Sequence, residues 1–291
     1  MRAHELRSIR ALPTRVRGVQ REGDQWVLRW TGCAVMGVVN VTPDSFSDGG
    51  QFSTTQAAVA HGLRLADQGA LVVDVGGESS RPGSTGVPLD VELERTIPVV
   101  EQLVAAGTAL VSVDTRKADV AAAAIKAGAH MVNDVGGFRS TRMVEVCAAA
   151  GIPVVAMHMQ GTPEDMQINP QYDDVVAEVT EFLETQAAML LSAGVPSVMI
   201  DPGLGFGKTY AHNIALLRAV PLSLKHPVLV GASRKRTIQQ LGGLADDDNR
   251  DAGSIAVHLF AAQQGVAMVR VHDVLGHHQA LAVDRALRDD A

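Results

Sequence analysis

The sequence predicts an α/β fold, a (β/α)8 TIM barrel with a short hairpin-like N-terminal extension, and three observations support this prediction. Eight short runs rich in Val, Ile, Leu and Met recur without clean polar alternation, which is typical of parallel strands covered on both faces. Segments of helical character separate these runs. No Pro- or Ser-rich linker interrupts the alternation between residues 35 and 274, so a single barrel is expected.

The expected strands occupy residues 35–41, 71–77, 110–115, 131–135, 154–159, 198–203, 227–234 and 268–274. A helix is expected over 90–106, with Asp90 as its cap and Gly107 as its stop, and a longer one over 172–193. Residues 1–34 form the N-terminal extension and 35–291 the barrel. Within the extension, we expect a hairpin over 16–30 that turns at residues 22–24 and closes the bottom of the barrel.

A doubly wound open sheet is the alternative fold, and the turn after the first strand argues against it. A nucleotide-binding turn of that fold needs G-x-G-x-x-G, whereas residues 40–50 are NVTPDSFSDGG. The segment PGLGFGKT (202–209) is close to a phosphate-binding loop, but Pro202 stands where the first glycine belongs. An ATPase is therefore disfavoured.

Composition and charge exclude several classes of protein. Apolar residues make up 46% of the chain, which is enough for a sizeable core. Acidic residues outnumber basic ones by 32 to 25, for a formal charge of -7, so a general nucleic-acid binder is disfavoured. Cys33 and Cys147 match no C-x-x-C spacing and are expected to be reduced. Neither a signal-peptide core nor a membrane-spanning run is apparent, so we expect a cytoplasmic protein without nucleic-acid or membrane partners.

Polar residues recur at the carboxyl ends of the expected strands, where a barrel gathers its catalytic groups. They are Asn40, Asp74, Asp114, Asn133, Asp134, His158, Asp201, Ser233, Arg234, Lys235, Arg270, His272 and Asp273. Any one of them could simply terminate a strand, but so many together indicate a site. Carboxylates and amides beside cations suit a ligand with N–H donors at one end and negative charge at the other. A pterin fits this description.

The region from Met36 to Val274 resembles dihydropteroate synthase. The matching segments are MGVVNVTPDSFSDGG (36–50), VDVGGESSRPGS (73–84), VSVDT (111–115), VNDV (132–135), MHMQG (157–161), DPGLGFGKT (201–209), GASRK (231–235) and VRVHD (269–273). Unrelated barrels share geometry without sharing loop sequences, so eight ordered matches are specific. The resemblance implies a transferase of folate biosynthesis that condenses 6-hydroxymethyl-7,8-dihydropterin diphosphate with 4-aminobenzoate. It also implies Mg2+ and a homodimer.

The resemblance assigns roles to individual residues. Asp114, Asn133, Asp201 and Lys235 would hold the pterin, and Asn40 would meet the metal that neutralises the diphosphate. Asp114, Asp201, Lys235 and Asp48 are grouped as catalytic, because the carboxylates would stabilise a cationic pterin. Arg270 and His272 would bind the diphosphate, and Ser233 is assigned to substrate binding. The aminobenzoate side would be formed by Phe46, Asp48, Ser80, Arg81, Pro82 and Phe206.

Two positions depart from the family pattern. Ser80 stands where the family often has Thr, and it keeps the hydroxyl group. Arg236 stands where Ser is usual, so it would either pair with the aminobenzoate carboxylate or crowd it. Outside the motifs, His158 and the pair His277 and His278 lack metal-ligand spacing and are expected to be structural or solvent-facing.

Two other functions are compatible with a pterin-binding barrel. A methyltetrahydrofolate:corrinoid methyltransferase-like enzyme should lack the diphosphate apparatus, whereas this chain has TPDSFSDGG, SRK and RVH together. A non-catalytic pterin-binding paralogue should have lost residues of the loops or of the anion site, and none is missing. The synthase is therefore the favoured function.

Overall fold

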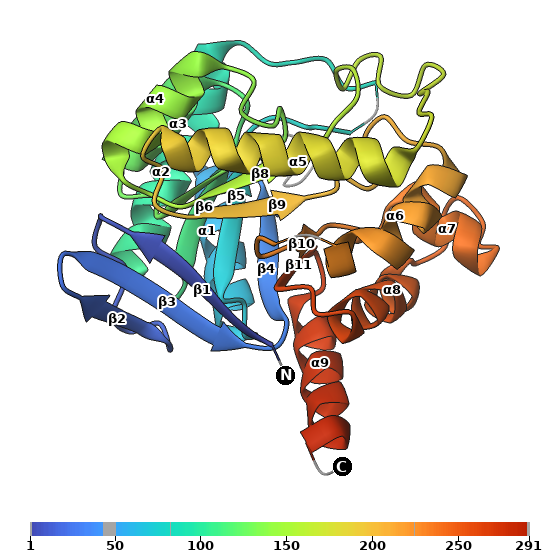
Figure 1. Cartoon of the computed structure of the whole chain (residues 1–291). Coiled ribbons are helices and arrows are strands. Elements are labelled where there is room, and N and C mark those ends of the chain that lie inside the picture. The colour runs from blue at the N-terminus through green and yellow to red at the C-terminus, as the bar shows by residue number, and fades with distance from the viewer. Residues whose placement is uncertain (1, 43–50, 82, 224, 290–291) are drawn as a thin grey trace.

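Eight parallel strands form the centre of the molecule in the computed structural model, which describes residues 2–42, 51–81, 83–223 and 225–289 (Figure 1). The sheet has the order β10-β11-β4-β5-β6-β7-β8-β9. Its strands are β4 (Ala34–Asn40), β5 (Val72–Gly76), β6 (Leu110–Asp114), β7 (Met131–Asp134), β8 (Val154–Met157), β9 (Val198–Asp201), β10 (Leu229–Val230) and β11 (Met268–Val271). The backbone N–H of Ile200 donates to the carbonyl of Pro227 at 3.0 Å, and Ile200 bridges to Val228, which joins the two ends of the sheet into a barrel.

All eight predicted strands are confirmed, and their burial explains their composition. Every residue of β5, β7, β8 and β9 is buried. A strand that is covered on both faces has no side exposed to solvent. Polar residues therefore do not alternate with apolar ones, and its sequence is a continuous apolar run.

Helices surround the barrel and follow its strands (Figure 1). They are α1 (Gln51–Asp67), α2 (Leu89–Ala106), α3 (Ala118–Lys126), α4 (Thr141–Ala150), α5 (Val175–Ser192), α6 (Tyr210–Ser223), α7 (Arg236–Gly242), α8 (Asp251–Gln263) and α9 (Val274–Asp289). The expected stop of α2 at Gly107 is confirmed, with φ of 64°. The expected cap at Asp90 is wrong: Pro88 precedes the helix, and Asp90 lies in its first turn, where its charge complements the helix dipole. Helix α5 begins later than expected because the Asp174 carboxylate caps the N–H groups of residues 176 and 177.

The N-terminal extension forms a three-stranded antiparallel sheet, β1-β3-β2, from β1 (Ala3–Ser8), β2 (Val19–Glu22) and β3 (Gln25–Thr31). The predicted hairpin is β2 and β3, and Gly23 occupies its turn with φ of 63°. Strand β1 was not predicted. Its inward residues are His4, Leu6 and Ser8, so only one of three is apolar and the alternation cannot be read from the sequence.

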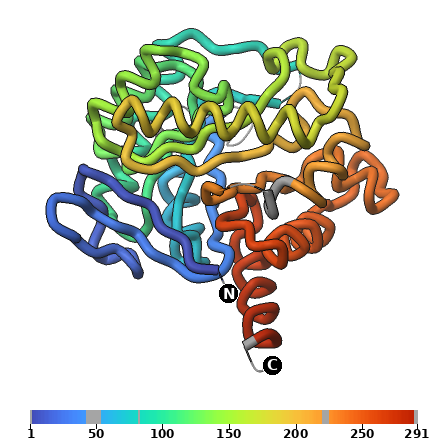
Figure 2. The backbone as a smooth tube through the Cα atoms, viewed as in Figure 1, coloured from blue at the N-terminus to red at the C-terminus, as the bar shows by residue number. Residues whose placement is uncertain are grey.

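This sheet lies across the amino end of the barrel (Figure 2). Leu6, Leu12, Val16 and Leu28 form one buried cluster with a residue from every barrel strand. The eight strand residues are Met36, Val72, Leu110, Met131, Val155, Met199, Leu229 and Met268. The amino end of the barrel is therefore filled with apolar side chains, and the polar strand ends lie at the opposite, carboxyl end.

Two sequence expectations concern the whole chain. Both cysteines, Cys33 and Cys147, are free and buried. None of the helices in the described ranges is long and apolar enough to cross a membrane.

Candidate active site at the carboxyl end of the barrel

Arg270 connects three strand ends at the mouth of the barrel. Its Nε donates to Oδ2 of Asp74 at 2.7 Å, and its Nη2 donates to Oδ2 of Asp114 at 2.7 Å. Asn133 Nδ2 donates to the same Asp74 oxygen at 3.0 Å. Burial raises the pKa of Asp114 to about 7, although the charge of Arg270 opposes the rise. The predicted residues Asp114, Asn133 and Arg270 therefore do come together, but through Asp74, a buried carboxylate that the residue assignment left out.

Asp201 and Lys235 form the second half of this site. Asp201 Oδ1 accepts from the backbone N–H of Gly203 at 2.7 Å, and Lys235 Nζ donates to the Leu204 carbonyl at 2.5 Å. Burial lowers the pKa of Lys235 to about 8, and Asp201 opposes that shift. Burial likewise raises the pKa of Asp201, against the charge of Lys235. Burial thus disfavours the charged forms of Asp201 and Lys235, and the charge of each residue is the largest effect that stabilises the charged form of the other.

Gly231 shows how close the two halves are. A Cβ atom added there would lie 3.8 Å from Asp201 Oδ2, 4.0 Å from Lys235 Nζ and 3.7 Å from Arg270 Cβ. The Asp201 carboxylate and the side chains of Lys235 and Arg270 therefore lie close together around Gly231, which has no side chain to fill the space between them.

Phe206, predicted for the aminobenzoate side, lies next to Lys235, predicted for the pterin side. Lys235 Nζ is 4.4 Å from the centre of the Phe206 ring, a cation–π distance. The ring is buried with Val135, Met157, Met159 and Met166.

Ser233 and His272 are paired, as the predicted anion site requires. Ser233 Oγ accepts from the His272 backbone N–H at 3.2 Å and lies 2.9 Å from its Nδ1. Burial lowers the pKa of His272 to about 4, with the charges of Arg234, Arg270 and Arg81 adding to the effect. The imidazole is therefore neutral at pH 7.

The remaining predicted residues occupy the rim or fall outside the described ranges. Asn40 ends β4, half-buried, in register with Gly76 on β5. Ser80 is half-buried and Arg81 exposed in the loop after β5. Arg236 is exposed on α7 and lines a surface hollow with Gln239 and Arg250. Phe46, Asp48 and Pro82 lie outside the residues that the structure describes.

The loop after β5 is held by an ion network that the sequence did not reveal. The Glu78 carboxylate accepts from Arg116 Nη2 at 2.7 Å, from Lys117 Nζ at 2.5 Å and from the Val87 N–H at 2.9 Å. Lys117 also bonds the buried Glu92 at 2.5 Å. These residues lie on three different elements, so no spacing in the sequence signals them.

A histidine pair fixes the loops that carry Ser233 and His272. His258 Nε2 accepts from the Ala232 N–H at 3.0 Å, which leaves the proton on Nδ1, 2.8 Å from His277 Nε2. His277 Nδ1 then donates to the Asp273 carbonyl at 2.6 Å. Of the two roles expected for His277, the structural one is therefore correct, whereas His278 is exposed.

Buried histidines make the fold sensitive to acid. Burial lowers the pKa of His4, His130 and His272 to about 4 and of His158 to about 3, from an ordinary value of 6.5. Below pH 6.5 the unfolded chain therefore binds a proton at each of these four histidines, whereas the folded chain does not. Asp114 partly offsets this difference, because its raised pKa lets the folded chain bind one proton that the unfolded chain does not. We expect the free energy of unfolding to be constant with respect to these histidines above pH 6.5 and to fall steadily towards pH 4. Urea unfolding at pH 7.5 and pH 5 measures this, and equal stabilities would contradict it.

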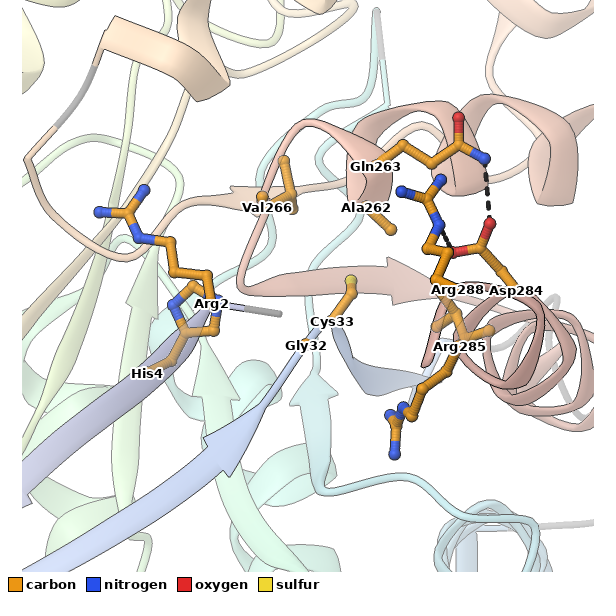
Figure 3. A pocket seen from close by; sticks show the side chains of 12 residues that line it. Arg2, His4, Gly32, Cys33, Ala262, Gln263, Val266, Asp284, Arg285 and Arg288 are labelled. Atoms are coloured by element: carbon orange, nitrogen blue, oxygen red, sulfur yellow. Dashed lines mark hydrogen bonds and ion pairs between the residues drawn. The ribbon is translucent and has the colours of Figure 1, made fainter. Parts of the chain in front are cut away.

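A separate cavity of about 130 Å3 lies at the amino end of the barrel, away from these groups (Figure 3). Arg2, His4, Arg285 and Arg288 are among its lining residues. Their guanidinium groups point in different directions, and that of Arg288 pairs with Asp284 at 3.0 Å. The cations do not converge on a common point, so the cavity is not an obvious anion site. The cluster at the carboxyl end remains the candidate active site.

No group of three His, Cys, Asp or Glu side chains suited to a metal ion occurs within the described ranges. A metal held entirely by such side chains is therefore not seen in that part of the chain. Mg2+ usually binds through one or two protein oxygens together with water and substrate phosphates, and the Asn40 amide oxygen at the rim is compatible with that mode.

Comparisons with known proteins agree with this geometry. The family described as pterin binding enzyme matches residues 36–272. The chain is 44% identical over 257 residues to dihydropteroate synthase of Escherichia coli K12, covering 87% of this chain and 90% of that one. Its identity to dihydropteroate synthase of Mycobacterium leprae is 45% over 260 residues, covering 86% and 91% of the two chains.

A solved structure extends the comparison to three dimensions. Dihydropteroate synthase of Xanthomonas albilineans, with 4-aminobenzoic acid, superimposes with a TM-score of 0.84 at 50% identity, covering 90% of this chain and 95% of that one. A structure of the same enzyme in complex with 7,8-dihydropteroate is also similar, with a TM-score of 0.80 and 47% identity. The chain therefore belongs to the dihydropteroate synthase family of pterin-binding enzymes.

Proposed function

We propose that this transferase condenses 6-hydroxymethyl-7,8-dihydropterin diphosphate with 4-aminobenzoate to give 7,8-dihydropteroate and diphosphate. The observation that carries the proposal is the convergence of Asp201, Lys235 and Arg270 around Gly231, with Arg270 bonded to Asp114. It provides buried acceptors for the N–H edge of a pterin and cations for the negative charge of its diphosphate.

The reaction needs positioning and electrostatics more than covalent catalysis. The bond between the exocyclic CH2 and the diphosphate oxygen breaks, the arylamine nitrogen bonds to the same carbon, and one amine proton is released. Positive charge that develops on the pterin is stabilised by the carboxylates of Asp114 and Asp201. Asn133 donates to Asp74, and Asp74 holds Arg270, which in turn donates to Asp114, so the Asp114 carboxylate is held in place.

The anion end of the site is formed by β10 and β11. Two nitrogens of Arg270, Nε and Nη2, are engaged by Asp74 and Asp114, so a diphosphate would meet its remaining Nη1. Ser233 and the neutral His272 supply hydrogen bonds beside it. Ser80, Arg81 and Phe206 would form the side where aminobenzoate enters.

Mg2+ would bind this site together with the diphosphate of the substrate. Asn40 would hold it through its amide oxygen, with diphosphate oxygens and water completing the shell. When bound, Mg2+ would neutralise charge on the departing diphosphate.

An assay of the purified protein tests the function. Dihydropteroate and diphosphate should appear when both substrates and Mg2+ are present. Pterin binding without product would instead indicate a non-catalytic paralogue, and methyl transfer from methyltetrahydrofolate to a corrinoid would indicate the methyltransferase. The two free, buried thiols favour a cytoplasmic site for the reaction.

We further propose a homodimer formed through α8 and α9. Phe260, Leu275, Val283 and Leu287 are large apolar side chains on these two helices, and all four are exposed, Leu287 to 76%.

Replacing Val283 and Leu287 together by Asp should convert the dimer to a monomer, because it would bury four charges per dimer in an apolar contact. Sedimentation equilibrium measures the mass. A wild-type monomer at micromolar concentration, or an unchanged dimer in the variant, would contradict the proposal.

A further inference from the structure

Lys208 is a second buried lysine beside the site, and no role described so far uses it. Only 3% of its surface is exposed. Its Nζ lies 2.9 Å from His158 Nδ1, 3.0 Å from the Phe206 carbonyl and 3.3 Å from the His158 carbonyl. An ammonium group has three N–H donors, so the three acceptors use all of them.

The surroundings of Lys208 act on its charge in opposite directions. Burial lowers its pKa to about 7; Asp201 opposes the shift, while Lys235 and Arg139 add to it. Burial and the charge of Lys208 lower the pKa of His158 to about 3, so the imidazole is neutral and its Nδ1 can accept. His158 is kept in place by the Phe182 ring, edge-on at 5.0 Å between ring centres.

Both lysines hold the loop between β9 and α6, to which Lys208 itself belongs. Lys235 donates to the carbonyl of Leu204, and Lys208 to that of Phe206, two residues further on. The other carbonyls of the loop also have donors: Phe206 N–H for Gly203, Gln167 Nε2 for Gly205 and Tyr172 Oη for Gly207. Every carbonyl from 203 to 207 is therefore hydrogen-bonded, which gives a short Gly-rich segment one defined path.

We propose that Lys208 is a positioning residue for the aminobenzoate side of the reaction. Its ammonium holds the Phe206 backbone against His158, so that the Phe206 ring stays next to the Lys235 ammonium. Asp201, Asn133 and Asp114 are set by strands, and Asp201 anchors only the first residue of the loop. The loss of Lys208 should therefore disturb aminobenzoate binding more than pterin binding. The inference rests on the proposed function.

Lys208→Met tests the proposal, because methionine keeps the length of the side chain and removes all three donors. The KM for aminobenzoate should rise at least tenfold, while the dissociation constant of the pterin diphosphate changes by less than threefold. Lys208→Arg, which keeps the charge and several donors, should recover part of the affinity. An unchanged KM for aminobenzoate in folded Lys208→Met, or an equal loss for both substrates, would overturn the proposal.

The acceptor His158 gives a second pair of variants in case the lysine variants do not fold. His158→Asn can present an oxygen near the position of Nδ1, whereas His158→Leu cannot. Leu should raise the KM for aminobenzoate and Asn should raise it less; equal effects would overturn the role of this acceptor. Lys126→Met controls for loss of an exposed lysine, and Leu190→Ala on α5 controls for loss of stability. Neither should change the ratio of the two affinities.

Hydrogen exchange separates this proposal from the function itself. If the wild-type protein makes no dihydropteroate, the proposed function fails, but the amide groups of 203–207 can still be compared in wild type and Lys208→Met. Exchange at least tenfold faster in the variant is the expected result. Unchanged exchange would overturn the role of Lys208 whatever the substrate.

Discussion

Replacement of Arg270 by methionine is expected to lower the free energy of unfolding by about 3–5 kcal/mol, the usual cost of breaking a buried ion pair from one side. Arg270 is the partner of both Asp74 and Asp114, and Asp74 is fully buried. Without the guanidinium, two carboxylates would lie close together with Asn133 as the remaining donor to Asp74. Urea unfolding measures the loss, and catalysis should be lost as well.

Two further variants make this prediction specific. Arg142→Met removes an equally short ion pair to Asp119, but both of these side chains are exposed, so the loss of stability should be far smaller than in Arg270→Met. Adding Asp74→Asn to Arg270→Met should restore part of the stability, since it removes one of the unpaired charges. If Arg270→Met were no more harmful than Arg142→Met, the buried network would not have the role given to it here.

Replacement of Asp201 by asparagine is expected to weaken pterin binding at least a hundredfold. The amide keeps the size of the side chain and an oxygen for the Gly203 N–H. It cannot accept two N–H groups from the ligand, and it brings an NH2 group against them. Two charge-assisted hydrogen bonds contribute about 1.5–3 kcal/mol each, and about 1.4 kcal/mol corresponds to a factor of ten in affinity.

Calorimetric titration of the pterin substrate measures this effect directly. Asp201→Ala should be at least as weak, since it leaves the donor edge of the ring without any partner. Asp119→Asn on the surface is the matched control and should bind like the wild type. An affinity of Asp201→Asn within threefold of wild type would show that the pterin binds elsewhere.

The barrel could be predicted from the sequence because its strands are buried on both faces and interrupted by helices with readable stops. What could not be predicted was set by contacts between distant segments. Strand β1 carries His4 and Ser8 on its inward face, so its alternation is hidden. The cap of α2 was misplaced because a proline before the helix took the position that Asp90 was expected to occupy.

The site residues show the same division. Motifs at strand ends identified Asp114, Asn133, Asp201, Lys235 and Arg270, because a barrel always brings those ends together. The partners that orient them were less visible. Asp74 is one of the polar residues expected at strand ends but was given no role, and Lys208 lies in the matching segment 201–209 but was given no role either. Its contact with His158 spans 50 residues, a separation that no local pattern reports.

The apolar cluster at the amino end of the barrel has a consequence for how the chain is made. Leu6, Leu12, Val16 and Leu28 are synthesised before the barrel, yet the residues that cover them extend to Met268, on β11. The first strand of the barrel, β4, likewise pairs with β11. During synthesis, the apolar side chains of residues 2–31 therefore stay exposed until β11 has been synthesised. We expect nascent chains that stop before β11 to be far more sensitive to protease in residues 2–31 than the finished protein, which makes this segment a natural target for chaperones.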